Sequence, residues 1–264
     1  VLKKSVHFIQ DLLTRGFVSE YYNLNYVLYP AIGIFFVLIF KKFILKKEVG
    51  HGIPDVLYAL SRNSGLIKSY QMWASVVTST VTVGFGGSVG LEGPTISTGA
   101  AIGSNIGRIL RLDFKRTLLL IGCASAGALA AIFKAPIAAI IFAIEVLMLD
   151  LTMAALLPVL IASVTGALVS YIFLEERFVY NFQVVHEFYI SEVPYYIIFG
   201  IFCGFISLYF TKVYGAIDKL FDKINGWFLR YAVGASALGL LIFLIPSFYG
   251  EGYDAVDACL QGDY

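Results

Sequence analysis

The chain has 264 residues, of which 59% are hydrophobic and 14% are charged. Soluble globular proteins have about 25% charged residues, so this chain has too few to cover a water-facing surface, and we expect most of it to lie in lipid. Nineteen basic and eighteen acidic residues give a net charge of +1, which excludes the concentrated basic face that nucleic-acid binding needs.

Apolar segments long enough to cross a bilayer, which takes about 20 residues, recur along the chain. They comprise 24–45, 69–89, 116–133, 151–174, 193–213 and 228–248. The first ends in the densest basic cluster of the sequence, Lys41, Lys42, Lys46 and Lys47, and the positive-inside rule therefore places this end in the cytoplasm. Residues 1–17 could end another helix. Because Val1 starts in the middle of a pattern, we expect the chain to be a piece of a longer protein.

Three shorter apolar segments each have a proline next to or at their start: 53–61, 95–110 and 136–149, with Pro54, Pro94 and Pro136. Proline is well tolerated in the first turn of a helix, because the N–H that it lacks would be unpaired there. The first two segments also follow glycine-rich backbone, and irregular backbone survives at membrane depth only inside protein or beside a wet cavity. The pattern favours broken helices that meet at an ion or substrate site, although ordinary loops at the membrane surface would give the same spacing.

Small residues recur at four-residue intervals: Gly86 and Gly90; Gly99, Gly103 and Gly107; Gly122, Ala126 and Ala130. Such ridges allow helix backbones to approach closely, so the sequence predicts an all-α integral membrane protein built as a compact bundle. The three cysteines are far apart and the sequence has no Cys/His cluster. We therefore expect neither a disulfide framework nor a metal site, and no cofactor.

Glu92 is a carboxylate within the segment Gly90-Leu91-Glu92-Gly93-Pro94, in the middle of a long apolar region. An intramembrane acid is costly and is functional by default. A helix start presents unpaired N–H groups and a partial positive charge that attract anions, and a tethered carboxylate there would occupy the place of a free anion. Glu92 therefore has the properties of a gate, of a proton carrier, or of both. The alternative is an acid that only stabilises the helix dipole.

A second glycine-flanked helix start is Gly50-His51-Gly52-Ile53-Pro54. The glycines expose backbone N–H groups, and His51 could donate a hydrogen bond to an anion, more strongly when protonated. The commoner situation for a single histidine is a hydrogen bond to a nearby carbonyl. Further along, Lys134 could snorkel to the interface or draw anions to a pore mouth. Glu145 is a second acid in apolar surroundings that could face either the bundle interior or the cytoplasmic end of its helix.

Residues 86–90 match the G-x-S-x-G pattern of hydrolase nucleophiles around Ser88, so a membrane serine hydrolase is an alternative. That pattern needs a strand before the serine and a helix after it, with acid and histidine partners later in the chain. Here a membrane helix precedes the serine, and the only later histidine is His186. We therefore expect this match to be accidental.

These segments resemble the CLC family of chloride channels and chloride/proton antiporters. Residues 50–54 are similar to its GSGIP segment, in the GHGxP variant of some bacterial members, and residues 90–94 are similar to its GREGP segment. Residues 130–136 with 142–145 are similar to AAxFxAP…FxxE, and Gly250-Glu251-Gly252-Tyr253 is similar to a later glycine turn. The resemblance covers essentially the whole chain.

The resemblance implies a homodimer in a bacterial inner membrane, with one pore in each subunit, built from inverted repeats of tilted and broken helices. Residues 1–192 would form the first repeat, with a truncated start, and residues 193–264 the beginning of the second. It implies chloride or another small anion held at helix starts by residues 50–54 and by Gly90, Leu91, Gly93 and Pro94. Glu92 would be the gating glutamate, which also carries the proton in the antiporters.

The chain departs from the family pattern at four places. His51 replaces a serine that helps to hold the anion, and Leu91 replaces a basic residue beside the gate. Val146 stands where antiporters have an inner proton-transfer glutamate; the adjacent Glu145 is turned about 100° around the helix. The family's GxFxP segment and inner tyrosine come later than Tyr264, so we expect this chain not to enclose the whole anion site.

The sequence therefore predicts anion transport, most simply of chloride, through a pore gated by Glu92 and similar to voltage-gated chloride channels. The alternatives are a chloride/proton antiporter, or a carrier that prefers fluoride or nitrate. A membrane serine hydrolase and a membrane scaffold without transport are more remote.

Overall fold

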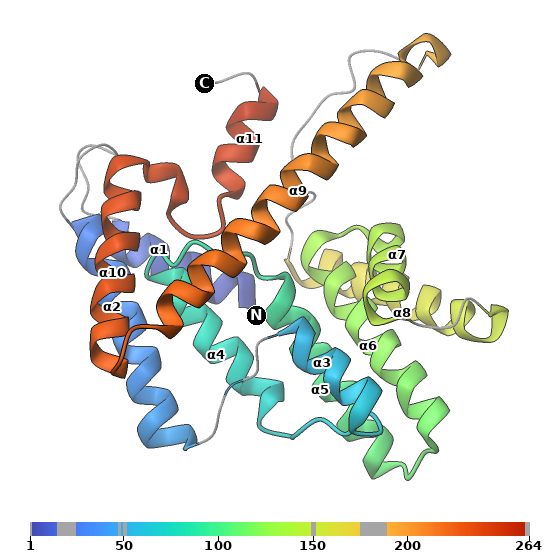
Figure 1. Ribbon diagram of the computed structural model, residues 1–264. Helices are drawn as coiled ribbons and strands as arrows, with labels where there is room; N and C mark the ends of the chain where they lie inside the picture. Colours follow the sequence, from blue (N-terminus) through green and yellow to red (C-terminus); the bar gives the residue numbers. More distant parts are fainter. Residues whose placement is uncertain are drawn as a thin grey trace.

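The computed structural model describes residues 2–14, 25–46, 49, 52–148, 152–174 and 189–261. Every regular element within these residues is helical (Figure 1), which confirms the all-α prediction. The α-helices are α1 (Leu2–Thr14), α2 (Asn25–Ile39), α3 (Ile53–Arg62), α4 (Gln71–Gly84), α5 (Glu92–Ile109), α6 (Phe114–Phe133), α7 (Pro136–Leu147), α8 (Met153–Leu174), α9 (Val193–Asp222), α10 (Trp227–Leu244) and α11 (Tyr253–Gln261). Shorter turns are the π-helical η1 (Phe40–Leu45) and the 3₁₀ turns η2 (Ile190–Glu192) and η3 (Pro246–Phe248).

The buried centre of the fold lies where α5, α6 and α8 pack against one another. Gly99, Gly103 and Gly107 of α5 all face α6, and a Cβ atom at Gly103 would lie 2.7 Å from the carbonyl oxygen of Leu120. Gly127 of α6 meets Gly166 of α8 in the same way. The predicted small-residue ridge on α5 is thus confirmed, because only glycine allows backbones to approach this closely.

We expect Gly103→Ala to destabilise the protein, because the added methyl group would lie 2.7 Å from Leu120 O and 2.8 Å from Ile121 Cα. Overpacking of this kind costs about 1–3 kcal/mol. The matched control is Gly204→Ala on α9, where nothing lies within 4 Å of the added Cβ and where alanine improves helix propensity equally. Thermal unfolding in detergent should show a lower midpoint for G103A than for G204A; equal midpoints would contradict the packing argument.

The loop between α3 and α4 is fixed to α5 by buried side chains. Ser104 Oγ donates to Gly65 O at 2.5 Å and accepts from Ile67 N at 2.9 Å. Asn105 Nδ2 donates to Ile67 O at 3.2 Å. These bonds satisfy loop backbone groups that would otherwise be costly to bury, and they hold the short helix α3 alongside α5.

Among the described residues, five helical segments are long and apolar enough to cross a membrane: Tyr26–Leu45, Phe114–Phe133, Met153–Phe173, Ile190–Asp222 and Trp227–Leu244. The predicted span 69–89 differs, because its helix α4 covers only Gln71–Gly84. The predicted short segments are α3, α5 and α7, and each has its proline in the first turn. Helix α9 has 30 residues, about 45 Å at about 1.5 Å per residue, so it must tilt or extend beyond a hydrocarbon core of about 30 Å.

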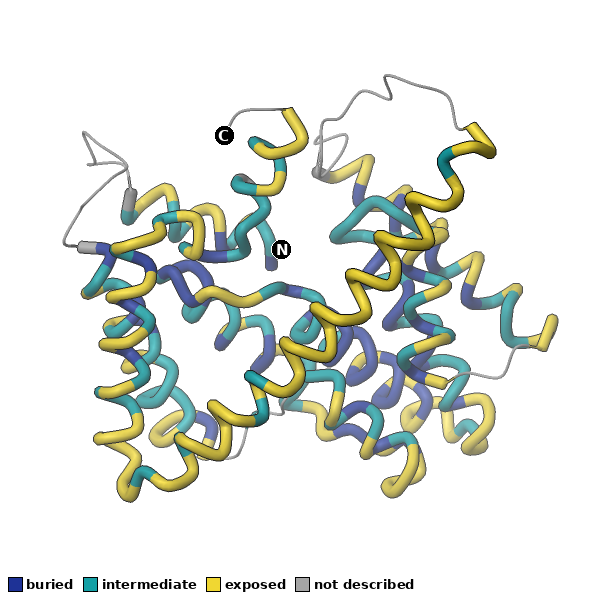
Figure 2. Tube along the Cα trace, turned by 45° about the horizontal axis from the view of Figure 1, so that its top comes forward, coloured by how far each residue is buried: buried dark blue, intermediate teal, exposed yellow. Residues whose placement is uncertain are grey.

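Helix α9 lies across the front of Figure 1 and is exposed along most of its length (Figure 2).

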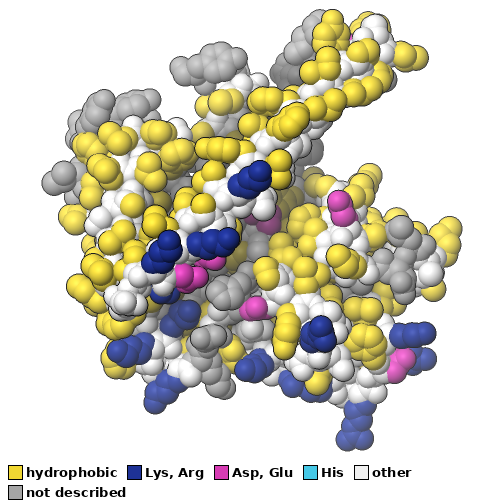
Figure 3. Space-filling model, in the orientation of Figure 1, with side chains coloured by type: hydrophobic (Ala, Val, Ile, Leu, Met, Phe, Trp, Pro, Cys, Tyr) yellow, Lys and Arg dark blue, Asp and Glu magenta, His cyan; other side chains and the backbone are white. Residues whose placement is uncertain are grey.

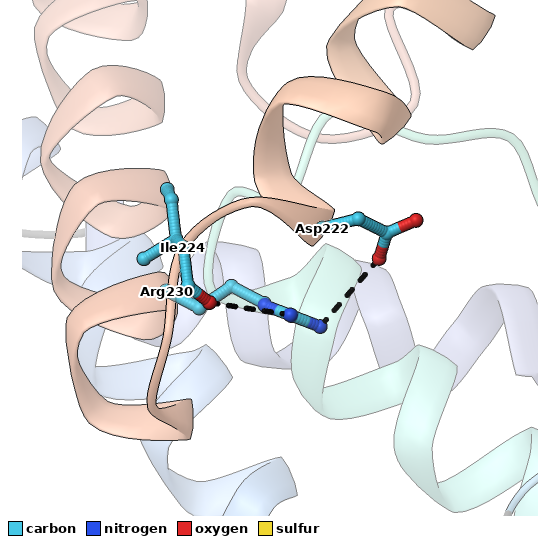
Figure 4. A network of polar contacts seen from close by, with 3 residues as sticks. All are labelled: Asp222, Ile224 and Arg230. Carbon is cyan, nitrogen blue, oxygen red and sulfur yellow. Dashed lines mark hydrogen bonds and ion pairs between the residues drawn. The ribbon is translucent and has the colours of Figure 1, made fainter.

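Helix α10, which follows α9, packs tightly on α2. Gly239 contacts the backbone of Val27, and Tyr231 Oη donates to Ala31 O at 2.9 Å. Arg230 joins the end of α9 to the start of α10, with contacts of 3.9 Å to Asp222 Oδ1 and 3.3 Å to Ile224 O (Figure 4). Because these groups are exposed, the ion pair adds little stability.

Candidate functional site

Two broken-helix starts lie side by side in the structure. Gly52 is the N-cap of α3 with φ +78°, and a Cβ atom placed on it would lie 3.5 Å from Gly93 Cα at the start of α5. Helix α5 begins at Glu92, whereas the sequence predicted a start at Thr95. The first turns of both helices carry unpaired N–H groups and partial positive charge, so their meeting creates a place suited to an anion.

The Glu92 side chain is held by a tyrosine from the far end of the chain. Glu92 is half-buried, and its Oε1 accepts a hydrogen bond of 2.9 Å from Tyr253 Oη, 161 positions later. Tyr253 is the first residue of α11, and its ring packs edge-on against Phe133 with centroids 6.2 Å apart. The carboxylate is thus fixed by a directional donor instead of projecting freely from the helix start.

Tyr253 reaches this position because two glycine-rich loops dock on each other. Val89 N donates to Gly250 O at 3.3 Å, and Tyr249 Oη donates to Gly84 O at 3.3 Å. Gly250 has φ +76° and Gly252 has φ +75°, a backbone region in which glycine has no Cβ penalty. The turn that begins α11 is therefore fastened to the loop that begins α5.

Gly90 leaves room for the Glu92 carboxylate. A Cβ atom built on Gly90 would overlap Glu92 Oε2. The carboxylate is therefore folded back over the glycine that precedes it by two positions, and any larger residue at position 90 would force it to move.

A cavity of about 590 Å³ contains Glu92 and both helix starts. It is lined by Val37, Lys41, Val49, Gly52, Ile53, Ser75, Thr78, Ser79, Thr82, Val89, Gly90, Glu92, Gly93 and Pro94. The Thr78 and Thr82 hydroxyls already donate to Ala74 O and Thr78 O, so Lys41 and the helix starts are the cavity's main sources of positive potential. The arrangement can attract a small anion and set it in competition with the Glu92 carboxylate.

The structure places the residues predicted for anion binding and gating in different environments. Gly52, Ile53, Gly90, Glu92, Gly93 and Pro94 line the cavity, and Pro54 follows in the first turn of α3. The side chain of Leu91 is 1% exposed and packs with Leu2, Val6 and Val83, so a basic residue in this position would be buried among apolar side chains. Gly50 and His51 lie outside the described residues.

A closed gap, too small to hold a water molecule, lies beside Leu91. It is lined by Lys3, Leu91, Ile132, Phe133, Glu251 and Tyr253, and both carboxylate oxygens of Glu251 are buried. The sequence placed Glu251 and Tyr253 only in a glycine turn and did not predict the bond between Tyr253 and Glu92. The glycines on either side of Glu251 were the available signal, because loops often carry site residues.

Lys134 and Glu145 lie away from Glu92's cavity. Lys134 ends α6 with φ +53°, and its Nζ lies 5.1 Å from the ring centroid of Tyr171, a cation–π contact. Glu145 is exposed near the end of α7. Neither lines the cavity that contains Glu92, and their part in a pore mouth or proton route stays a prediction. Among the described residues, no group of three or more His, Cys, Asp or Glu side chains could hold a metal ion.

Comparison with known proteins decides the family. The sequence matches the family described as "Voltage gated chloride channel" over residues 32–264. The chain belongs to the voltage-gated chloride channel, or CLC, family. An uncharacterised protein from Methanocaldococcus jannaschii is 27% identical over 236 residues, which are 86% of this chain and 57% of that protein. The CLC chain described here therefore spans little more than half the length of this relative.

Two solved structures have the same fold. A CLC-type fluoride/proton antiporter is 26% identical with a TM-score of 0.82, covering 100% of this chain and 66% of that one. A slow cyanobacterial Cl⁻/H⁺ antiporter is 19% identical with a TM-score of 0.80, covering 97% and 63%. These matches show an all-helical CLC fold and a multi-pass integral membrane protein.

Membership in a family of transporters shows that the protein is not an enzyme, and the serine-hydrolase alternative is wrong. The structure gives the physical reason at Ser88. This serine follows helix α4 and a turn, whereas a nucleophile elbow requires a strand in front of the serine.

Proposed function

We propose that this CLC chain carries the gated half of an anion pathway, with Glu92 as the gate. One observation supports this most directly: the Glu92 carboxylate lies at the first residue of α5, in a cavity that also contains the start of α3. Two helix starts attract negative charge to one place. A tethered carboxylate and a mobile anion would compete for it.

The gating step follows from this competition. While Glu92 is ionised, its carboxylate remains near the helix starts and opposes anion entry. Protonation removes its charge, and the neutral side chain no longer competes with the anion for positive potential. The Tyr253 hydroxyl donates to the carboxylate at 2.9 Å, so opening also requires this hydrogen bond to break.

The transported ion is most simply chloride, and the mode is a channel or a proton antiporter. A valine at position 146, where the resemblance implies a proton-transfer glutamate, favours a channel or another proton route. The relative described as a fluoride/proton antiporter makes fluoride the first alternative ion. We further propose a homodimer in a bacterial inner membrane, with the first repeat in residues 1–192 and the second beginning at residue 193.

Flux measurements on the full-length protein in liposomes test this function. We expect chloride efflux that depends on the protein and is reduced by competing fluoride or nitrate. A channel should give a reversal potential set by the anion gradient alone, whereas an antiporter should also move chloride in response to a pH gradient. Liposomes without measurable flux of any halide or nitrate, at either pH, would overturn the proposal.

A further inference from the structure

The end of α2 is wound as a π-helical turn, η1, that gathers lysines. Lys46 N donates to Lys41 O at 3.0 Å, an i→i+5 bond. This wider turn places Lys46 one turn above Lys41, whereas an α-helical turn would place it above Lys42 alone. Lys41, Lys42 and Lys46 all line one cavity as a result.

This cavity has a volume of about 810 Å³ and joins cationic side chains to an apolar wall. It is lined by Phe35, Leu38, Ile39, Lys41, Lys42, Phe43, Lys46 and Trp227. Lys42 Nζ lies 5.2 Å from the ring centroid of Trp227 and 5.8 Å from that of Phe43. Its described lining includes three lysines and no acidic residue.

The tight packing of α10 on α2 at Val27 and Gly239 lies at the other end of this helix pair. The cavity lies at the basic end of the span Tyr26–Leu45, which the positive-inside rule assigns to the cytoplasmic side. Lys and Arg side chains gather on the lower side of Figure 3, below a surface that is mainly hydrophobic. Trp227 and Phe43 remain 57% and 65% exposed there, as expected of aromatic side chains at a membrane interface. Arg230 contacts Asp222 Oδ1 and Ile224 O in the turn just before Trp227 (Figure 4).

We propose that this cavity binds an anionic phospholipid of the cytoplasmic leaflet. Its phosphate contacts Lys41, Lys42 and Lys46, and its acyl chains lie along Phe35, Leu38 and Trp227. A free anion would satisfy the lysines but would leave the apolar wall exposed, whereas a lipid matches both parts. Basic clusters at this level of a membrane protein recognise anionic headgroups.

Lys41 also lines the cavity that contains Glu92. A phosphate bound beside Lys41 would reduce the positive potential there. If Glu92 gates anions as proposed above, anionic lipid would therefore lower the affinity of the pathway for anions. Lipid binding itself does not depend on that function.

The test measures lipid binding to the purified full-length protein, without any transport assay. Native mass spectrometry counts bound phosphatidylglycerol against phosphatidylcholine for the wild type and for the triple variant Lys41→Gln, Lys42→Gln, Lys46→Gln. The matched control is Arg62→Gln, Lys68→Gln, Lys115→Gln, which removes the same charge from exposed residues outside the cavity. A third variant with arginine at positions 41, 42 and 46 keeps the charge.

We expect phosphatidylglycerol to bind the first triple variant on the order of a hundredfold more weakly. The control and the arginine variant should bind it as the wild type does, and millimolar inorganic phosphate should not displace it. Equal losses in the triple variant and its control would overturn the proposal, as would equal binding of the two lipids by the wild type. Displacement by inorganic phosphate would assign the cavity to a free anion instead.

Discussion

Glu92→Gln is expected to abolish proton coupling, if the wild type has any, and to leave anion flux independent of pH. Glutamine has the shape of a protonated glutamate but cannot ionise, so it no longer competes with an anion at the two helix starts. The measurement is chloride flux from liposomes between pH 4.5 and 7.5, together with the proton flux that an antiporter would show. We expect the wild-type flux to fall as the pH rises, and E92Q to keep its acid-side flux throughout.

The control for this substitution is Glu192→Gln, which makes the same chemical change at a half-buried acid just before α9, whose Oε2 accepts a hydrogen bond of 3.4 Å from Tyr196 Oη. Its pH profile should follow that of the wild type. If E92Q retained the pH profile and the coupling of the wild type, Glu92 would have no part in gating, and the carboxylate would only stabilise the start of α5.

Tyr253→Phe is expected to release the Glu92 carboxylate while leaving it chemically intact. The variant removes the 2.9 Å hydrogen bond from Tyr253 Oη and keeps the ring that packs against Phe133. A hydrogen bond to a charged group contributes roughly 1.5–3 kcal/mol, so the balance between held and released carboxylate should shift at least tenfold toward release. Because the hydroxyl no longer holds the carboxylate in place, the pH profile of flux should shift, with more flux near neutral pH in Y253F than in the wild type.

Tyr249→Phe is the matched control, because it removes a neighbouring tyrosine hydroxyl that donates to Gly84 O and not to Glu92. Any loss of local packing stability should appear in both variants, as a lower thermal midpoint. The shift in the pH profile should appear only in Y253F. Identical pH profiles for Y253F and the wild type would show that this hydrogen bond does not control the gate.

Local signals in the sequence predicted the helix starts and the packing ridge. Pro54, Pro94 and Pro136 mark α3, α5 and α7, because a proline in the first turn loses no hydrogen bond. Gly103 lies in the α5–α6 contact, because four-residue spacing keeps small residues on one helix face. The start of α5 was nevertheless predicted three residues late, since Glu92 and Gly93 carry no strong local signal for being inside the helix.

Contacts between distant segments could not be predicted in this way. Leu91 was interpreted as a missing charge beside the gate, and the structure shows a buried core residue. The lysines at the end of α2 were interpreted only as a topology signal, because an α-helical reading does not anticipate a π-helical turn that places Lys46 above Lys41. Both outcomes depend on what packs around the residue.

The sequence by itself determined that this is a helical membrane protein of the CLC family, and it determined where the short helices begin. Composition, proline position and small-residue spacing do not depend on contacts between distant residues, so they can be interpreted before the fold is known. Only the tertiary structure decided that Gly52 lies against Gly93 and that Tyr253 donates to Glu92 across 161 positions. These contacts arise from the docking of two glycine turns, and docking is a property of the packed chain.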